Sequence, residues 1–252
     1  MSDFSSDSLI LVDGASSGIG RMTALRLLES GARVLGVARR EDRLKEIQER
    51  YPDTFFFESK DLSADPDELS GFVDGLVKKY GKFSGYVHCA GVLNPQPLSI
   101  WNYQDALKDF NINLFSAIGF IKGLAKKKNK QDLLSIVLVS SIAATIGNPG
   151  SVSYAITKAG LDNLVISLTQ EIGKQNIRIN AIRPGWTDTA LVKGYKEVLG
   201  VDFLERAQTK TPSGKAGKPE YIADVISFLL SEKSYWIQGQ TLTVDGAETC
   251  GA

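Results

Sequence analysis

The chain has 252 residues, of which 43% are hydrophobic and 23% charged, which is ordinary usage for one large α/β domain or two small ones. Its 29 Lys and Arg residues balance its 29 Asp and Glu residues, so there is no global basic field to attract nucleic acid. No apolar run reaches the roughly 18 residues of a membrane helix, and the N-terminus has no signal-peptide pattern. The two cysteines give neither a disulfide framework nor a zinc spacing. We therefore expect a soluble cytoplasmic protein without a metal site.

Catalysis by histidine has little support, because the chain contains a single histidine, His88. Any Ser-His-Asp or Cys-His mechanism would have to use it. Its neighbour Cys89 would lie on the same strand, where adjacent side chains point to opposite faces. A Cys-His dyad is therefore not expected here.

Short apolar segments alternate with longer amphipathic segments along the whole chain, which predicts alternating strands and helices. In chain order we predict seven strands, at 9–12, 33–38, 54–57, 85–90, 133–140, 177–182 and 241–244. The helices between and after them are predicted at 19–30, 41–50, 66–80, 105–128, 153–174 and 220–230. Such alternation is typical of an α/β fold, a doubly wound parallel sheet with right-handed crossovers and helices on both faces.

A glycine-rich turn, Gly14-Ala15-Ser16-Ser17-Gly18-Ile19-Gly20, joins the first predicted strand to the first helix. Glycine permits positive φ angles and lets the backbone come close to a pyrophosphate, and a helix N-terminus offers free N–H groups. The turn thus predicts a dinucleotide site of the Rossmann type. The alternative interpretation is a tight turn that binds nothing.

Tyr154 precedes Lys158 by four residues, and Ser141 lies thirteen residues before the tyrosine. Residues four apart share one face of a helix. A lysine ammonium there favours tyrosinate, which we expect to lower the pKa of Tyr154 from about 10 toward working pH. Ser141 ends an apolar strand, where α/β enzymes bind ligands. The three side chains predict hydride transfer to or from a carbonyl.

The combined pattern resembles the classical short-chain dehydrogenases/reductases over nearly the whole chain, from about Leu9 to Gly246. It is carried by Gly14, Gly18 and Gly20, then His88-Cys89-Ala90-Gly91, then Ser141, Tyr154 and Lys158. The similarity is greatest to the branch of 3-oxoacyl-[acyl-carrier-protein] reductases. It implies a single domain over 1–252, with a cofactor half at about 8–130 and a catalytic and substrate half at about 131–252.

The resemblance also assigns roles to the catalytic residues. It implies that Tyr154 is the general acid in reduction and the base in oxidation. Lys158 would lower the tyrosine pKa and bond the nicotinamide ribose, and Ser141 would orient the carbonyl. Asn113 matches the family asparagine that holds a water of the proton relay. Asn111 is its rival, and a residue at a helix kink is the alternative for Asn113.

The cofactor implied by the resemblance is NAD(P), and NADP is expected rather than NAD. Arg39 and Arg40 follow the second strand, where an acidic residue would select NAD, and guanidinium groups suit a 2′-phosphate. Two solvated arginines are the alternative. Asp61 matches the position at the adenine edge, and Thr187 and Thr189 match the carboxamide contacts, unless they only cap a turn. The expected cofactor contacts are Gly14, Ser16, Ser17, Gly18, Ile19, Gly20, Arg39, Arg40, Asp61, Leu62, Ala90, Gly91, Tyr154, Lys158, Pro184, Gly185, Thr187 and Thr189.

Two positions depart from the family pattern. Asp13 stands where the family has threonine, and His88 stands where it has asparagine. We expect Asp13 to make the tie between first and fourth strands that the threonine makes, by bonding the backbone near Cys89 or the ring of His88. Independent drift of the two positions is the alternative.

The substrate is a small carbonyl or alcohol compound that the sequence does not identify. We expect Leu93, Ile142 and Trp186 to line its pocket, and the segment 191–212 to form a mobile lid that includes Tyr195, Val198, Leu199, Phe203 and Leu204. The lysine run 126–130 could dock an acidic carrier protein, although a solvated loop is the better interpretation. Rival functions are a nucleotide sensor without catalysis, an NAD-dependent alcohol or sugar dehydrogenase, and a sugar-nucleotide epimerase or dehydratase.

A homo-oligomer, tetramer or dimer, is implied by the resemblance. Two candidate interfaces are the chain end at 244–250 and the apolar stripe formed by Leu161, Leu164, Val165, Leu168 and Ile172. The same stripe could instead be core packing.

Overall fold

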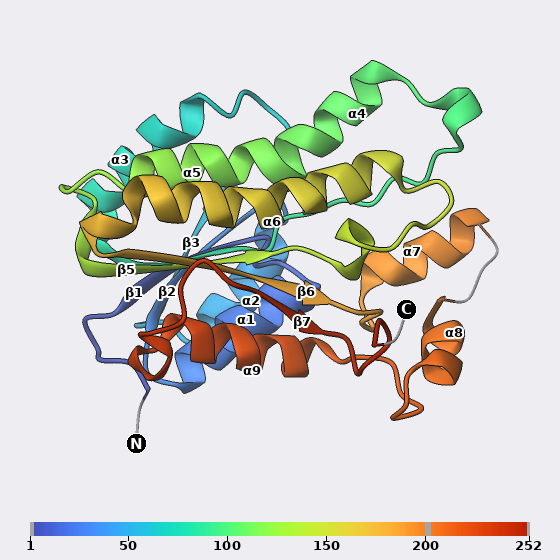
Figure 1. Cartoon of the computed structure of the whole chain (residues 1–252). Coiled ribbons are helices and arrows are strands. Elements are labelled where there is room, and N and C mark those ends of the chain that lie inside the picture. Colours follow the sequence, from blue (N-terminus) through green and yellow to red (C-terminus); the bar gives the residue numbers. More distant parts are fainter. Residues whose placement is uncertain (1–2, 200–202, 251–252) are drawn as a thin grey trace.

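A computed structural model describes residues 3–199 and 203–250. As the sequence predicts, the strands form one seven-stranded parallel sheet (Figure 1). The structure gives its order as β3-β2-β1-β4-β5-β6-β7. Their bounds are β1 Leu9–Asp13, β2 Arg33–Ala38, β3 Phe55–Ser59, β4 Phe83–His88, β5 Lys130–Val139, β6 Ile177–Pro184 and β7 Thr241–Val244. This is the Rossmann-type doubly wound arrangement.

Helices cover both faces of the sheet, with α3, α4, α5 and α6 on one side and α1, α2 and α9 on the other (Figure 1). Their bounds are α1 Gly18–Glu29, α2 Glu41–Arg50, α3 Glu68–Tyr80, α4 Tyr103–Phe110, α5 Ser116–Leu124, α6 Val152–Ile172, α7 Ala190–Leu199, α8 Phe203–Lys210 and α9 Pro219–Leu230. None of the helices within the described residues is both long and apolar enough to span a membrane.

The central strand β1 is apolar up to Asp13 because each of its faces meets a layer of helices. In β1, Leu9 and Leu11 pack into the core beneath α3, α5 and α6, whereas Ile10 and Val12 pack into the core beneath α1 and α9. Side chains alternate between faces along a strand, so burial of both faces requires an unbroken apolar run. The continuous hydrophobic segments seen in the sequence are thus explained.

The single helix predicted over 105–128 forms as a continuous helical segment over 103–124, but it contains a π-helical turn and ends four residues early. α4 ends at Phe110, a π-helical turn spans Asn111–Phe115, and α5 follows. Within the turn, the Asn113 side chain bonds the backbone of Val92 and the hydroxyl of Thr157. A π-helical turn adds a residue to the local repeat and occurs frequently at functional sites.

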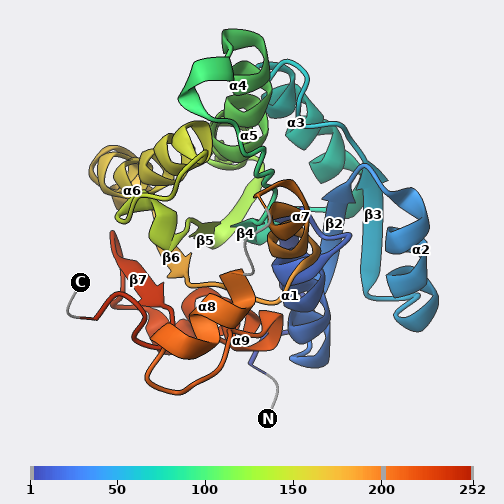
Figure 2. The same cartoon turned by 90° about the vertical axis from the view of Figure 1, so that its right-hand side faces the viewer.

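The strand order reverses between β1 and β4, and in such sheets ligands bind beyond the carboxyl ends of the strands at that point. Figure 2 looks onto this edge of the sheet, with α7 and α8 in front of it. In the described part of segment 191–212, which we expected to form a lid, lie most of α7 and all of α8. Both helices stand in front of the carboxyl edge of the sheet.

The structure bears on two predictions about the surface, the lysine run 126–130 and the apolar stripe of α6. Lys126 and Lys128 both pair with Asp74, at 3.0 and 3.2 Å, and the lysine run lies just before β5, at the end of the sheet opposite the candidate site. The solvated-loop interpretation is favoured over carrier docking. The α6 stripe is core, because Leu161, Val165 and Ile172 are buried beneath the helix.

Candidate active site

The glycine turn forms a bare backbone cradle between β1 and α1. Gly14 has a φ of 64°, and a Cβ atom there would lie 2.7 Å from the backbone nitrogen of Ala90. A Cβ atom on Gly20 would collide with the carbonyl oxygen of Gly14. The helix starts at Gly18 with no acidic residue in its first turn, so its N–H groups and partial positive charge face the cradle. These features fit a dinucleotide pyrophosphate.

Arg40 lies against this turn, although its side chain is mostly exposed. Its Nε and Nη2 atoms donate to the Ser16 hydroxyl at 3.2 and 3.0 Å, and Nη2 also donates to the Ser17 hydroxyl at 2.6 Å. A guanidinium and two hydroxyl groups thus converge beside the end of β2. All three groups can donate hydrogen bonds to a phosphate.

Ser141, Tyr154 and Lys158 meet at the carboxyl end of β5. Ser141 is the second residue after the end of β5. Its Oγ atom accepts a hydrogen bond from the backbone N–H of Ala143 at 3.1 Å. Tyr154 and Lys158 lie in the first two turns of α6, and the Lys158 Nζ atom is 5.6 Å from the centre of the Tyr154 ring. The three side chains therefore share one pocket wall.

The pKa expected for Tyr154 is corrected by the structure. Among the chain's own groups, burial raises the pKa of Tyr154 above 10, and a hydrogen bond with Ser141 lowers it by less. The Lys158 ammonium is directed to the Val139 carbonyl oxygen, 2.7 Å away. Sequence spacing places the two residues on one face but does not fix where a flexible lysine points.

The pKa of Lys158 is also shifted. The side chain is buried, and this burial lowers the pKa of Lys158 from its ordinary 10.5 to about 8, with the negative charges of Asp13 and Asp162 acting in the opposite direction. A lysine with a pKa this close to neutrality is typical of a functional site.

Asn113 lies behind the pocket wall and does not line the pocket. A Cβ atom on Gly91 would lie 3.4 Å from Lys158 Nζ and 3.7 Å from Asn113 Oδ1, so Gly91 separates the two side chains. Asn113 Oδ1 accepts the Val92 N–H, and Nδ2 donates to the Val92 carbonyl. The rival, Asn111, donates to the Ser63 carbonyl outside the pocket.

The link that we expected Asp13 to make between β1 and the end of β4 is confirmed. Its carboxylate accepts the backbone N–H groups of Cys89 and Ala90, at 2.8 and 2.7 Å, and contacts the His88 ring. His88 and Cys89 lie on opposite faces of the sheet, as expected, so they form no dyad.

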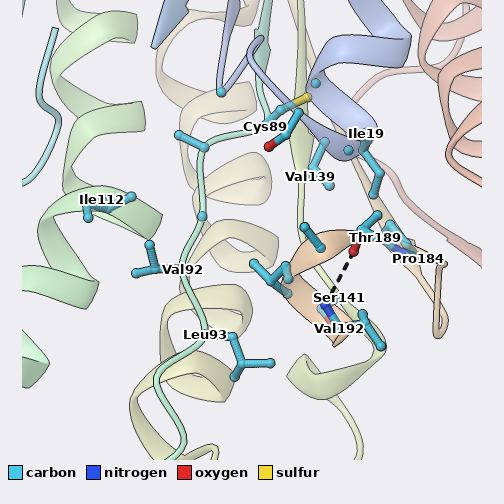
Figure 3. A pocket seen from close by; sticks show the side chains of 18 of the residues that line it. Ile19, Cys89, Val92, Leu93, Ile112, Val139, Ser141, Pro184, Thr189 and Val192 are labelled. Atoms are coloured by element: carbon cyan, nitrogen blue, oxygen red, sulfur yellow. Dashed lines mark hydrogen bonds between the residues drawn. The ribbon is translucent and has the colours of Figure 1, made fainter. Parts of the chain in front are cut away.

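These groups surround a pocket of about 260 Å³ at the carboxyl edge of the sheet. In Figure 3, Ile19 and Cys89 lie at one end of it and Leu93 toward the other. Every site residue predicted from the sequence lines the pocket except Asn113. Leu191 and Val192 come from the segment predicted to cover the substrate. The sequence did not identify several further lining residues: Ala38, Lys60, Cys89, Val92, Ile112, Val139, Ser140, Ala143, Asn148, Ser151 and Ala190.

Thr187 and Thr189 lie where β6 leads into α7. Thr187 is buried, and its hydroxyl donates to the Gly185 carbonyl at 3.0 Å. The Thr189 hydroxyl accepts the Val192 N–H at 3.5 Å (Figure 3), while its methyl group faces Gly18 across the pocket. The two threonines thus cap a turn and also border the glycine cradle.

The far end of the pocket is apolar. Leu93, Ile142 and Trp186 line it as predicted, together with Leu191 and Val192 from α7. Leu204 of α8 packs on the same small cluster. Four other lid residues were named from the sequence, Tyr195, Val198, Leu199 and Phe203. The structure describes their backbone in α7 and α8, and their side chains lie outside what it describes. Within residues 3–199 and 203–250 no group of three or more His, Cys, Asp or Glu side chains could hold a metal ion.

Known proteins resemble this chain over almost its full length. The family described as "Enoyl-(Acyl carrier protein) reductase" matches residues 14–247. A 3-oxoacyl-[acyl-carrier-protein] reductase of Thermotoga maritima is 32% identical over 246 residues, covering 94% of this chain and 95% of the relative. The corresponding reductase of Chlamydia muridarum is 31% identical over 240 residues, with 94% and 95% covered.

Solved structures agree with this result. The aldohexose dehydrogenase of Thermoplasma acidophilum superposes with a TM-score of 0.86 at 25% identity, covering 98% of this chain and 95% of that one. A short-chain dehydrogenase/reductase titled glucose/ribitol dehydrogenase, from Brucella melitensis, superposes with a TM-score of 0.88 at 25% identity and 98% of both chains covered. With its glycine cradle and its Ser-Tyr-Lys wall, this chain belongs to the short-chain dehydrogenase/reductase family of NAD(P)-dependent oxidoreductases.

Proposed function

We propose that this protein is an NADP(H)-dependent reductase that converts a carbonyl group, in a 3-oxoacyl compound or a related ketone, to an alcohol. One observation carries the proposal: Ser141, Tyr154 and Lys158 line one wall of the pocket whose other end is the glycine cradle. A nucleotide sensor without catalysis would have no need for all three side chains.

The chain's own groups fit the proton-transfer half of such a reaction. A bound nicotinamide would supply the hydride in reduction and take it back in oxidation. Tyr154 would donate its phenolic proton to the substrate oxygen, and the phenolate would take that proton back in the reverse direction. Ser141 accepts the Ala143 N–H and hydrogen-bonds Tyr154, so its hydroxyl lies beside the phenol, where it would stabilise charge on a substrate oxygen. Lys158 keeps two N–H donors beyond the one given to Val139, which suits a ribose hydroxyl pair.

The apolar end of the pocket favours a ketone with a hydrocarbon side over a sugar. The side chains of Leu93, Ile142 and Val192 carry no hydrogen-bonding group, and the Trp186 side chain bonds Glu248, whereas a sugar needs several polar partners in its pocket. The 3-oxoacyl reductases among the relatives agree with this. The two sugar dehydrogenases among the solved structures, together with Asn148 and Ser151 at the pocket wall, support the sugar alternative.

A substrate panel tests the proposed function. The purified protein would be given 3-oxoacyl thioesters, simple ketones and aldoses in turn, with oxidation or formation of NADPH followed by absorbance. We expect turnover of 3-oxo thioesters with a catalytic efficiency at least about tenfold above that for any aldose. Turnover of aldoses alone would replace the ketoreductase proposal by the sugar dehydrogenase alternative. A comparison of carrier-bound with free thioester would show whether a carrier contributes.

Preference for NADP(H) is supported by the position of Arg40, beside the turn and beyond the end of β2. Its contacts with Ser16 and Ser17 hold the guanidinium next to the cradle, and no acidic side chain lies in the two positions after Ala38. Arg39 lines the same pocket end. Arginine suits a phosphate because its donors form a rigid fork.

Replacing Arg40 by aspartate should reverse the cofactor preference. Arg40→Asp removes a donor to a 2′-phosphate and adds a repulsive charge, so the ratio of kcat/KM for NADPH to that for NADH should fall by about 100-fold or more. Arg50→Asp, at the other end of α2 and outside the pocket, makes the same charge change and should leave the ratio unaltered. A wild-type protein that uses NADH as well as NADPH would refute the preference itself.

Self-association, as a tetramer or dimer, belongs to the same proposal. The outward side of α6 carries Val152, Ile156 and Ile166, each more than 40% exposed, and Phe228 of α9 is 41% exposed. Apolar side chains gathered on two helices support contacts with further copies. Action in the cytoplasm also remains part of the proposal.

A further inference from the structure

The most unusual feature of the interior is a buried polar cluster formed by Asp13, Tyr86 and His88. Asp13 ends β1 and His88 ends the neighbouring β4, directly opposite in the register of the sheet. All three side chains are fully buried. Asp13 Oδ2 accepts the Tyr86 hydroxyl at 2.7 Å and faces His88 Nδ1 at 2.8 Å, and Oδ1 accepts the N–H groups of Cys89 and Ala90.

Both ring nitrogens of His88 face hydrogen-bond acceptors. Nδ1 faces the Asp13 carboxylate, and Nε2 lies 3.0 Å from the backbone carbonyl oxygen of Asn113. A neutral imidazole has one N–H, so either tautomer would set a nitrogen lone pair against an oxygen lone pair at one of the two contacts. Beside an ionised Asp13, only the imidazolium, with two N–H groups, satisfies both contacts. The contacts therefore favour an ion pair of Asp13 and a charged His88.

The surrounding titratable groups are consistent with this assignment. Burial raises the pKa of Tyr86 and of Cys89, so both stay neutral beside the carboxylate. The Lys158 ammonium also acts on Asp13 but is bonded to Val139. Burial acts to raise the pKa of Asp13, but the charge and hydrogen bond of His88, together with hydrogen bonds from Tyr86 and the Ala90 backbone, outweigh it, and that pKa is lowered. A buried carboxylate without a paired cation would be strongly unfavourable.

The pair connects two parts of the site that are far apart in the sequence. Through Asp13 it fixes the exit of β4 at Cys89 and Ala90, against which Gly14 is packed. Through His88 Nε2 the pair bonds the backbone carbonyl of Asn113 in the π-helical turn. The Asn113 side chain in turn hydrogen-bonds both the N–H and the carbonyl of Val92. The wall from Ala90 to Val92 is thus held from both sides, between the glycine cradle and Lys158.

We propose that His88 is a positioning residue that acts as an imidazolium paired with Asp13, and that this pair holds the Ala90–Val92 wall in register with the glycine cradle. The pair occupies the two positions where this chain departs from the threonine and asparagine of its family. Each substitution would be harmful without the other: Asp13 alone would leave an unpaired anion behind a site for phosphates, and His88 alone would lack its anion.

A spectroscopic test uses the fact that His88 is the single histidine of the chain. In protein labelled with ¹⁵N-histidine and free of a histidine tag, the imidazole gives one pair of ring nitrogen signals. We expect both nitrogens at the chemical shift of protonated nitrogen at pH 7, with and without NADPH. One nitrogen at the shift of an unprotonated ring would overturn the proposal. The readout does not depend on turnover, so it is independent of the proposed function.

A double-mutant cycle tests the coupling between the two residues. His88→Asn leaves Asp13 without its cation, and we expect the Kd for NADPH, measured by calorimetry, to rise at least about tenfold. In Asp13→Thr/His88→Asn, which installs the family pair, we expect Kd to return to within about threefold of wild type. Equal or greater weakening in the double variant would mean that the residues act separately, and it would refute the pairing. If His88→Asn does not fold while the double variant does, the coupling is supported by that rescue.

Discussion

Tyr154→Phe should reduce kcat by about 10³-fold while changing the Kd for NADPH by no more than about threefold. General acid catalysis by a placed side chain contributes about 10² to 10⁴-fold. The variant removes only the phenolic oxygen, whereas the glycine cradle and Arg40 remain in place. Steady-state kinetics with the best substrate from the panel, together with calorimetric titration of NADPH, would measure both effects.

The matched control is Tyr235→Phe, which removes the same hydroxyl from a side chain that is 59% exposed and outside the pocket. It should keep wild-type kcat and Kd. A kcat for Tyr154→Phe within tenfold of wild type would contradict the proposed proton transfer. A rise of more than about threefold in the Kd for NADPH would contradict the expectation that the phenol serves proton transfer and contributes little to cofactor binding.

Lys158→Met should make the protein more stable and nearly inactive. A pKa of about 8 in place of 10.5 means that burying the charged ammonium costs about 3 kcal/mol. Methionine avoids this cost but loses the hydrogen bond to Val139, worth about 1 kcal/mol, so we expect a net gain of about 2 kcal/mol at pH 7. Because Lys158 lies beside Tyr154 in the pocket, kcat/KM should fall by about 100-fold or more.

The pH dependence of this gain identifies its cause. The folded-state pKa lies below the unfolded value, so the cost of the buried charge is fully present below pH 8. Between about pH 8 and 10.5 the folded protein releases the proton before the unfolded chain does, and wild-type stability rises relative to the variant. Urea unfolding at pH 7 and pH 10 should therefore show a shrinking difference. Lys174→Met, at an exposed lysine just after α6, should show neither the gain nor its pH dependence; a constant difference for Lys158→Met would exclude the charge as its origin.

Much of the fold could be predicted because its signals are local. The bounds of β2, α2 and β7 match the sequence-based ranges, since each depends on an apolar run or an amphipathic period bounded by polar residues. The helix predicted over 105–128 is right in kind, but the prediction missed its π-helical turn, in which Asn113 contacts Val92, twenty-one residues earlier. Hydrophobic periodicity carries no information about such a contact.

The sequence by itself determined which chemistry the site offers. The glycine spacing, the i,i+4 relation of Tyr154 and Lys158, and the serine after an apolar strand are properties of short segments, so they can be seen without coordinates. Only the tertiary structure decided how these groups act. It directs Lys158 to Val139, brings Arg40 onto Ser16, and joins Asp13 to His88 across seventy-five residues. Protonation and hydrogen bonding depend on burial and on neighbours from distant segments, and only folding sets those two conditions.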